Sequence, residues 1–309
     1  MTSPRLPGAP SKGDRLDRLA LVSARVPFRL KVAAVWVAIF GLLGLFFAIA
    51  QFDVDWMRSH VRIIIAGVQY TLYIALGGIV LAIGLATIGA LGRISRSPVA
   101  YGISGFYVSF FRGTPLIVQM FLIFSALPQV GVNLRGSYPG IPEWLESFYV
   151  LDPAVAGTLA LGLNYGAYLT EIFRAGIQSV SGGQGEAADA LGMTYAQKMR
   201  KVVLPQAFRV IIPPTGNEFI AMLKDSALVS FLGVTFESAE IFRRAQVAGN
   251  ADFKPMEALL VAAGIYWALT GVFTFFQRRL EDRVSKGYVR TAPPRTREQP
   301  VPLPRQEDP

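Results

Sequence analysis

Four long stretches of the chain contain no charged side chain. They cover residues 32–50, 63–92, 153–170 and 258–277 of a sequence of 309 residues. The hydrocarbon core of a bilayer requires about 20 mostly apolar residues in a helix, so each stretch predicts a transmembrane span. The composition agrees, because 52% of the residues are hydrophobic and only 17% are charged, against roughly 25% charged residues in an ordinary soluble domain.

Two further apolar stretches contain interruptions. Around residues 99–127 a single arginine, Arg112, is followed by Gly113-Thr114-Pro115, and there is no room for a loop, so we expect one long, broken helix. The last stretch, 206–223, contains Pro213 and Pro214 and is also expected to be broken, because proline removes helix donors. The sequence therefore predicts an all-α membrane protein with six transmembrane helices.

The distribution of basic residues predicts the orientation. With the N-terminus inside, the inner segments carry 22 basic and 9 acidic residues, and the outer loops carry 7 and 10. This positive-inside pattern predicts a multi-pass protein of a bacterial inner (plasma) membrane, N-in and C-in. It also accounts for the net charge of +9 without nucleic-acid binding. Residues 48–50 resemble a signal-peptidase site, but the 31 residues before the first span argue against cleavage.

The division of the chain follows from these spans. Residues 1–30 and 286–309 are rich in Pro, Arg and Ser/Thr and are expected to be disordered cytoplasmic tails. Residues 31–62 form an extra N-terminal transmembrane helix with an outside loop. Residues 63–285 form the main transmembrane domain, with its longest inside loop at 179–205.

Several kinds of chemistry are excluded by composition. The chain has no cysteine and one histidine, His60, which removes disulfides, thiolate metal sites and most zinc or Ser-His chemistry. It contains no G-x4-G-K-[ST] sequence, so no P-loop binds nucleotide here. We therefore expect no catalytic residues, no cofactor and no metal site; the chain is not predicted to be an enzyme.

The inside loop at 179–205 predicts two short helices. The first runs from Glu186 to Leu191 and ends where Gly192 can adopt the left-handed conformation. Thr194 and Gln197 match a capping box for the second, on which Tyr195, Met199, Val202 and Val203 form one apolar stripe. The run 182–185 is expected to be a flexible entry. Such a helix suits either an ordinary interfacial connector or a face for a cytoplasmic partner.

The spacing EAA-x3-G-x9-V-x-LP in this loop resembles the EAA loop of ABC-importer permease subunits. Segments 107–128, 171–180 and 202–230 resemble the polar-amino-acid branch of that family in the same order, and the resemblance covers roughly residues 63–280. Val202 stands where the family usually has Ile. The N-terminal span and the outside loop at 129–152 lie beyond the five-helix core of the type I permease fold. The residues that match the loop motif are Glu186, Ala187, Ala188, Gly192, Leu204 and Pro205.

The resemblance implies a transport complex. Its partners are a second permease subunit, as a homodimer or heterodimer, a cytoplasmic ABC ATPase that docks the EAA loop and hydrolyses ATP, and an external binding protein that delivers a polar L-amino acid. The remaining alternative is an autonomous secondary transporter or channel. That alternative needs an ion-coupling set of acids, and only Glu171 and Glu218 are available.

Polar residues at membrane depth are candidates for the substrate pathway. An isolated Arg112 would cost about 2.5–3.5 kcal/mol at mid-bilayer, so it either pins the broken backbone or lines the pathway. Asn164 is either an interhelical hydrogen bond or a substrate contact; Glu171 and Arg174 suit a local ion pair. Lys224 and Asp225 suit a pair near the outer surface or a gate. The candidates are Arg112 for a carboxylate, Glu218 and Asn217 for an amino group, and Thr114, Asn164, Lys224 and Asp225.

Overall fold

The computed structural model describes residues 27–138, 140, 142 and 150–284, all of which are helical or irregular, with no strand among them. The predictions for the two tails therefore fall almost entirely outside the described residues, as do residues 139, 141 and 143–149 of the outside loop at 129–152. The chain divides into two compact units, residues 1–57 and 58–309, which are described separately.

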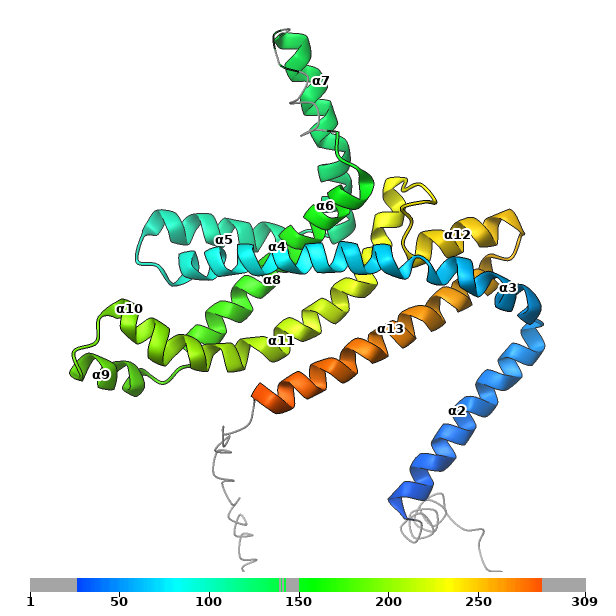
Figure 1. Ribbon diagram of the computed structural model, residues 1–309, viewed down its shortest axis with the longest axis horizontal. Coiled ribbons are helices and arrows are strands. Elements are labelled where there is room, and N and C mark those ends of the chain that lie inside the picture. Colours follow the sequence, from blue (N-terminus) through cyan, green and yellow to red (C-terminus); the bar gives the residue numbers. More distant parts are fainter. Residues whose placement is uncertain (1–26, 139, 141, 143–149, 285–309) are drawn as a thin grey trace, which may run out of the picture. The chain divides into compact units, whose positions relative to one another are not determined.

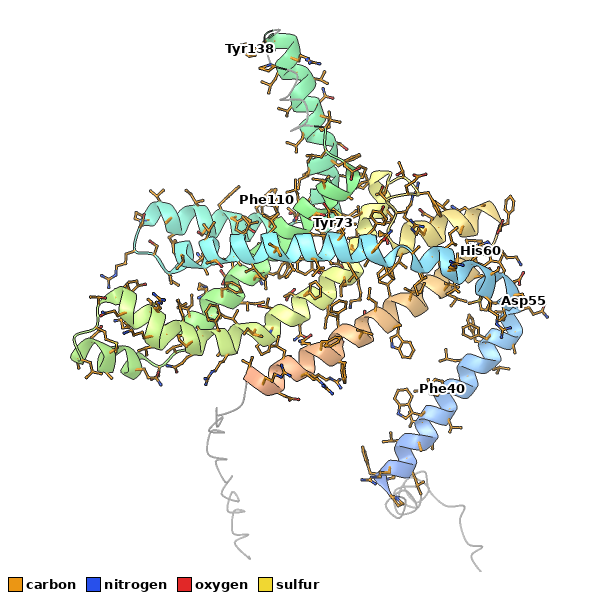
Figure 2. The ribbon with its side chains drawn as sticks, in the orientation of Figure 1. Phe40, Asp55, His60, Tyr73, Phe110 and Tyr138 are labelled. Atoms are coloured by element: carbon orange, nitrogen blue, oxygen red, sulfur yellow. The ribbon has the colours of Figure 1, made fainter. Side chains whose placement is uncertain are left out.

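The first unit contains α2 (Phe28–Ala50) and the start of α3 (Val54–Ile65). No residue of α2 is buried, and its side chains are apolar along nearly the whole length; Figure 2 shows Phe40 projecting from it. Gln51 ends α2 in the left-handed conformation, and the Asp53 carboxylate accepts a hydrogen bond from the Trp56 N–H at 2.9 Å, which starts α3. An apolar helix without buried residues is what the predicted extra span requires.

The second unit is a bundle built around two long helices, α4 (Val68–Ile94) and α8 (Pro153–Gln178). The other helices of the unit are α5 (Pro98–Gly113), α6 (Leu116–Phe121), the π-helix η1 (Leu122–Ala126), α7 (Leu127–Ser137), α9 (Gly182–Ala190), α10 (Tyr195–Lys198), the π-helix η3 (Met199–Val203), α11 (Leu204–Asp225), the 3-10 helix η4 (Ser226–Leu232), α12 (Ile241–Ala251) and α13 (Pro255–Val284). In Figure 1, α5 runs beside α4, and α11 lies between α8 and α13.

Small residues allow α4 and α8 to pack closely. Ala82 and Ala86 of α4 are fully buried. On α8 an added Cβ would lie 2.5 Å from the Leu81 side chain at Gly162 and equally close to the Tyr107 hydroxyl at Gly166. These alanines and glycines therefore serve helix packing. Close backbone approach of this kind favours helix association where no hydrophobic driving force acts between helices.

The span predicted at 63–92 corresponds to α4, which is apolar enough to cross a membrane but begins only at Val68. Helix α3 ends at Ile65, a turn covers residues 66–67, and α4 begins at Val68. The physical reason lies at Gly67, where a Cβ would lie 2.6 Å from the backbone nitrogen of Ile241. The start of α12 is thus packed directly against this turn. Absence of charge predicted the membrane segment, but it could not locate this contact.

Four helical segments of the described chain are long and apolar enough to cross a membrane: α2, α4, the continuous segment Leu116–Ser137, and α13. The predicted spans at 153–170 and 206–223 correspond to α8 and α11, with 26 and 22 residues, which are less apolar. The architecture is therefore all-helical with several candidate spans, and the number six and the N-in, C-in orientation remain predictions.

Candidate functional site

The predicted break near Arg112 is confirmed. Helix α5 ends at Gly113, Thr114 and Pro115 are extended, and α6 starts at Leu116. The chain then continues through η1 and α7 to Ser137, ten residues beyond the predicted end at 127. Figure 2 labels Phe110 close to the point where α5 gives way to α6. Proline at 115 disfavours the helical conformation for Thr114, which explains the position of the break.

The carbonyls freed by this break are satisfied by amide side chains. The Gln119 Nε2 donates to the Phe111 carbonyl at 2.9 Å, to the Thr114 carbonyl at 3.0 Å and to the Thr114 hydroxyl at 2.7 Å. The Asn164 Nδ2 from α8 donates to the same Phe111 carbonyl at 2.9 Å and to Gln119 Oε1 at 3.0 Å. Gln119 and Asn164 are both buried. Asn164 therefore makes the interhelical hydrogen bond that was one of its two predicted roles, and sequence reasoning missed Gln119.

Arg112 does not pin the break. Its guanidinium carbon lies 5.0 Å from the centre of the Tyr168 ring on α8, a cation–π distance. Within the described residues it forms no ion pair. The side-chain amides of Gln119 and Asn164 bind the freed carbonyls instead. The Arg112 guanidinium is therefore available to an anionic group.

Helix α11 is continuous, contrary to the prediction of a break at Pro213 and Pro214. Gln277 of α13 donates to the Pro213 carbonyl at 3.2 Å and to Asn217 Oδ1 at 2.8 Å, and the Thr215 hydroxyl donates to the Ile211 carbonyl at 2.8 Å. Pro213 and Pro214 lack the N–H groups that would bond the carbonyls of residues 209 and 210, so these contacts stabilise the segment without replacing the missing bonds. The Asn217 side chain is therefore hydrogen-bonded to α13. On the helix it points about 100° away from the side chain of Glu218, with which it was predicted to act.

Glu218 and Asp225 lie on one face of α11. They are seven residues apart, two turns of the helix, so they are almost aligned. The Tyr165 hydroxyl of α8 donates to Asp225 Oδ2 at 2.8 Å. On α8 the centres of the Tyr165 and Tyr168 rings are 6.4 Å apart, and the Arg112 guanidinium lies over the second of these rings. The structure thus brings together Arg112, Glu218, Asp225, Tyr165 and Tyr168, which we call the charged cluster.

The predicted pairing of Lys224 with Asp225 is wrong. Asp225 is bonded to Tyr165, while Lys224 is exposed and has no ion-pair partner among the described residues. Adjacent residues of a helix point about 100° apart, so the two side chains cannot share one face of α11. The sequence analysis did not predict the roles of Tyr165 and Tyr168, because their partners Asp225 and Arg112 are about 60 positions away in the chain.

An apolar cavity of about 510 Å³ lies near the break but away from the charged residues. Its lining comes from Phe110, Phe111 and Gln119 together with leucines of α4 and α8 and residues of η1 and α7. Apart from Gln119, the lining is apolar, so this cavity offers no partner for the two charges of an amino acid. A search of the described residues also finds no group of three His, Cys, Asp or Glu that could hold a metal ion.

The loop at 179–205 is a helical hairpin. Helix α9 starts at Gly182, earlier than predicted, so 182–185 is its first turn and not a flexible entry. Gly192 has φ of 73°, and Thr194 and Gln197 form the predicted capping box. The Lys198 ammonium contacts both oxygens of Asp189 at 2.8 Å. The π-helix η3 follows and displaces Tyr195 from the predicted apolar stripe; Tyr195 is exposed.

The residues of the EAA pattern divide between the inside and the outside of this hairpin. Ala188 is buried, Leu204 is half-buried, and Glu186, Ala187, Gly192 and Pro205 are exposed. Glu186, Ala187 and the exposed Leu191 and Tyr195 leave an uncovered surface of mixed polarity.

The predicted ion pair of Glu171 and Arg174 is confirmed, with Arg174 Nη2 2.7 Å from Glu171 Oε2. The structure adds Arg93 of α4, whose Nε lies 3.2 Å from Glu171 Oε1 and whose guanidinium covers the Tyr101 ring of α5. Glu171 therefore joins α4 to α8. Its paired state removes it from the set of acids available for ion coupling.

This chain is similar in sequence and in fold to known transport proteins. Residues 78–286 match the family model described as binding-protein-dependent transport system inner membrane component. The chain is 37% identical over 239 residues to the probable amino-acid ABC transporter permease protein PatM of Vibrio harveyi, covering 77% of this chain and 99% of that protein. It is 35% identical over 221 residues to the histidine/lysine/arginine/ornithine transport system permease protein HisQ of Escherichia coli, covering 70% and 92%. A crystal structure of an amino acid ABC transporter with histidines matches with a TM-score of 0.64 and 35% identity, covering 75% of this chain and 98% of that one.

Proposed function

The chain belongs to the family of binding-protein-dependent transport system inner membrane components, as a multi-pass amino-acid ABC transporter permease of the inner membrane. We propose that it forms the pathway for polar L-amino acids. We further propose that a separate ATPase subunit drives it through the EAA loop. The observation that carries this proposal is the charged cluster, in which the Arg112 guanidinium of α5 and two carboxylates of α11 lie around two tyrosines of α8. A zwitterion that leaves water needs partners for both of its charges.

Arg112 is the proposed partner of the substrate carboxylate, because a guanidinium binds a carboxylate through two parallel hydrogen bonds. Glu218 is the proposed partner of the α-amino group. Replacement of Arg112 by Lys retains the charge but removes the bidentate geometry. Thr114 and Asn164 are proposed to support the site through the broken backbone, to which both are hydrogen-bonded.

The proposed contact with the ATPase is the hairpin of α9 and α10. Its turn depends on Gly192, whose positive φ costs other L-residues about 1–2 kcal/mol, and its exposed end carries Glu186. The remaining proposed partners are a second permease subunit and an external amino-acid-binding protein. The second of these is proposed because the family is described as part of binding-protein-dependent transport systems. ATP hydrolysis is assigned to the separate subunit.

The coupling proposal is tested in liposomes that contain the whole complex. Glu186→Lys and Gly192→Asp should each abolish transport and transport-dependent ATP hydrolysis while the protein remains in the membrane. Lys201→Gln, which removes an exposed charge of η3 outside the EAA pattern, is the control and should leave both activities unchanged. Full transport-dependent ATPase activity in both test variants would contradict the coupling role.

The substrate proposal is tested by uptake of radiolabelled amino acids, sugars and oligopeptides by the same complex. Uptake confined to sugars or peptides would contradict the substrate class. Glu218→Gln should weaken amino-acid transport by roughly 1.5–3 kcal/mol if it removes a charge-assisted hydrogen bond, that is, by about 10- to 100-fold, and Arg112→Lys should also impair it. Gradient-driven uptake by the isolated chain would instead favour a secondary transporter.

A further inference from the structure

The charged cluster contains more negative than positive charge. Glu218 and Asp225 supply two carboxylates, and Arg112 supplies one guanidinium that has no carboxylate partner among the described residues. Lys224 does not correct this imbalance, because it is exposed and projects about 100° away from the face that carries the two acids. The cluster alone therefore has a net charge of −1.

The residues of the cluster also follow a definite order along the contact between the antiparallel helices α8 and α11. At one end of the contact between α8 and α11, Gly157 of α8 meets Val229, just beyond α11; at the other end, Gly176 meets Ile211. Later residues of α8 therefore lie beside earlier residues of α11. Tyr168, which Arg112 covers, is accordingly on the Glu218 side, and Tyr165 is on the Asp225 side. The two carboxylate positions are about 10 Å apart along the axis of α11.

From this arrangement we propose that the amino acid transported by this chain has a cationic side chain. The proposal rests on the proposed function. Arg112 and Glu218 bind the α-carboxylate and α-amino groups at one end of the cluster, and Asp225 binds the side-chain cation at the other. A substrate with a net charge of +1 balances the cluster, whereas a neutral side chain leaves Asp225 unpaired and an acidic side chain brings two carboxylates together, which both cost free energy.

The environment of Asp225 suits this role. The Tyr165 hydroxyl donates to Oδ2 at 2.8 Å, and the Tyr165 side chain is only 5% exposed, so one carboxylate oxygen is held by a residue with little freedom to move. No hydrogen bond of the described residues occupies Oδ1. Asp225 thus presents one fixed, free acceptor oxygen. Tyr165 is a positioning residue that acts through Asp225, and it was outside the predicted set.

Arginine and citrulline provide the test, because they have nearly the same shape and differ in the charge of the side chain. Equilibrium binding of each radiolabelled amino acid should be measured on the purified permease–ATPase complex without its external binding protein, so that the specificity of that protein does not contribute. The wild type should bind arginine at least ten times more tightly than citrulline. Glu237→Gln, which neutralises an exposed acid outside the cluster, is the matched control and should preserve this ratio.

Asp225→Asn should lower arginine affinity by at least tenfold, to the level of citrulline, and should leave citrulline affinity within twofold. Tyr165→Phe should lower arginine affinity about three- to tenfold with citrulline unchanged, whereas a purely structural role would weaken both ligands equally. Glu218→Gln should weaken both ligands, because it contacts the α-amino group that they share.

The possible failures are distinguishable. Equal affinity of the wild type for arginine and citrulline would overturn the cationic-substrate inference and leave the amino-acid permease intact. A preference for glutamate would overturn it as well. If the complex binds no amino acid but binds a sugar or a peptide, the proposed function itself is wrong. The wild-type ratio decides the inference even if the Asp225 variant does not fold.

Discussion

Two regions of this chain contain proline within an apolar helical stretch, and they differ in outcome. At Thr114-Pro115 the helix breaks and resumes as α6, whereas at Pro213-Pro214 helix α11 continues without interruption. In both regions an amide side chain donates to a nearby backbone carbonyl. Gln119 does this from within the same chain segment and is buried; Gln277 does it from a neighbouring helix at a partly exposed site.

The difference teaches that proline permits a break in a membrane helix but does not cause one. Before Pro115, Thr114 adopts the extended conformation, and Gln119 and Asn164 bind the carbonyls that are exposed as a result. Before Pro213 stand two β-branched residues, Ile211 and Ile212, of which Ile211 is buried against Gly176. Packing of that kind holds the helical conformation in place, and Gln277 of the neighbouring helix adds a hydrogen bond to the Pro213 carbonyl.

The largest effect should come from Gln119→Leu. This change leaves the half-buried Thr114 carbonyl without a donor, removes one of two donors to Phe111 and leaves Asn164 with one partner fewer, so we expect destabilisation of about 2–4 kcal/mol. The midpoint of heat-induced loss of the monodisperse peak in detergent measures it. Gln129→Leu, an exposed glutamine of α7, is the control. A midpoint equal to wild type would mean that the break does not depend on its amide donors.

Asn164→Ala should have an intermediate effect of about 1–2 kcal/mol in the same assay. The Phe111 carbonyl keeps its bond to Gln119, and only Gln119 Oε1 loses a buried partner. Combining Asn164→Ala with Gln119→Leu should cost less than the sum of the two single changes, because they share this hydrogen bond. Strict additivity would show that the two amides act independently.

Gln277→Leu should have the smallest effect, below about 1 kcal/mol, because its bond to Asn217 is at an exposed site where water can replace it. Thermal stability should fall only slightly, and α11 should remain helical. A loss as large as that of Gln119→Leu would remove the distinction between the two proline regions and show that α13 holds α11 against its own prolines.

The sequence predicted those features that depend on neighbours in the chain. Apolar runs located the helices, the capping box at Thr194 and the left-handed Gly192 were confirmed, and so was the ion pair of Glu171 with Arg174. The break at Thr114-Pro115 was confirmed because proline acts on the residue before it.

The features that the sequence did not predict depend on contacts between distant segments. The turn at Gly67 exists because the start of α12 packs against it. Gln277 of α13 binds the Pro213 carbonyl of α11, and Tyr165 of α8 binds Asp225. None of these partners is within 50 positions of the other, so no local pattern indicates them. The sequence analysis therefore paired Asp225 with its chain neighbour Lys224 and not with Tyr165.

The path of the chain from η3 through α11 has a mechanical consequence. Helical structure is unbroken from Met199 to Asp225, so the hairpin and both acids of the charged cluster are attached to one rod about 40 Å long. A rotation of that rod by about 10° would move its far end by roughly 7 Å, which is more than the rise of one helical turn. Motion imposed at the hairpin must therefore reposition Glu218 and Asp225, and a ligand that immobilises those acids must in turn resist motion of the hairpin.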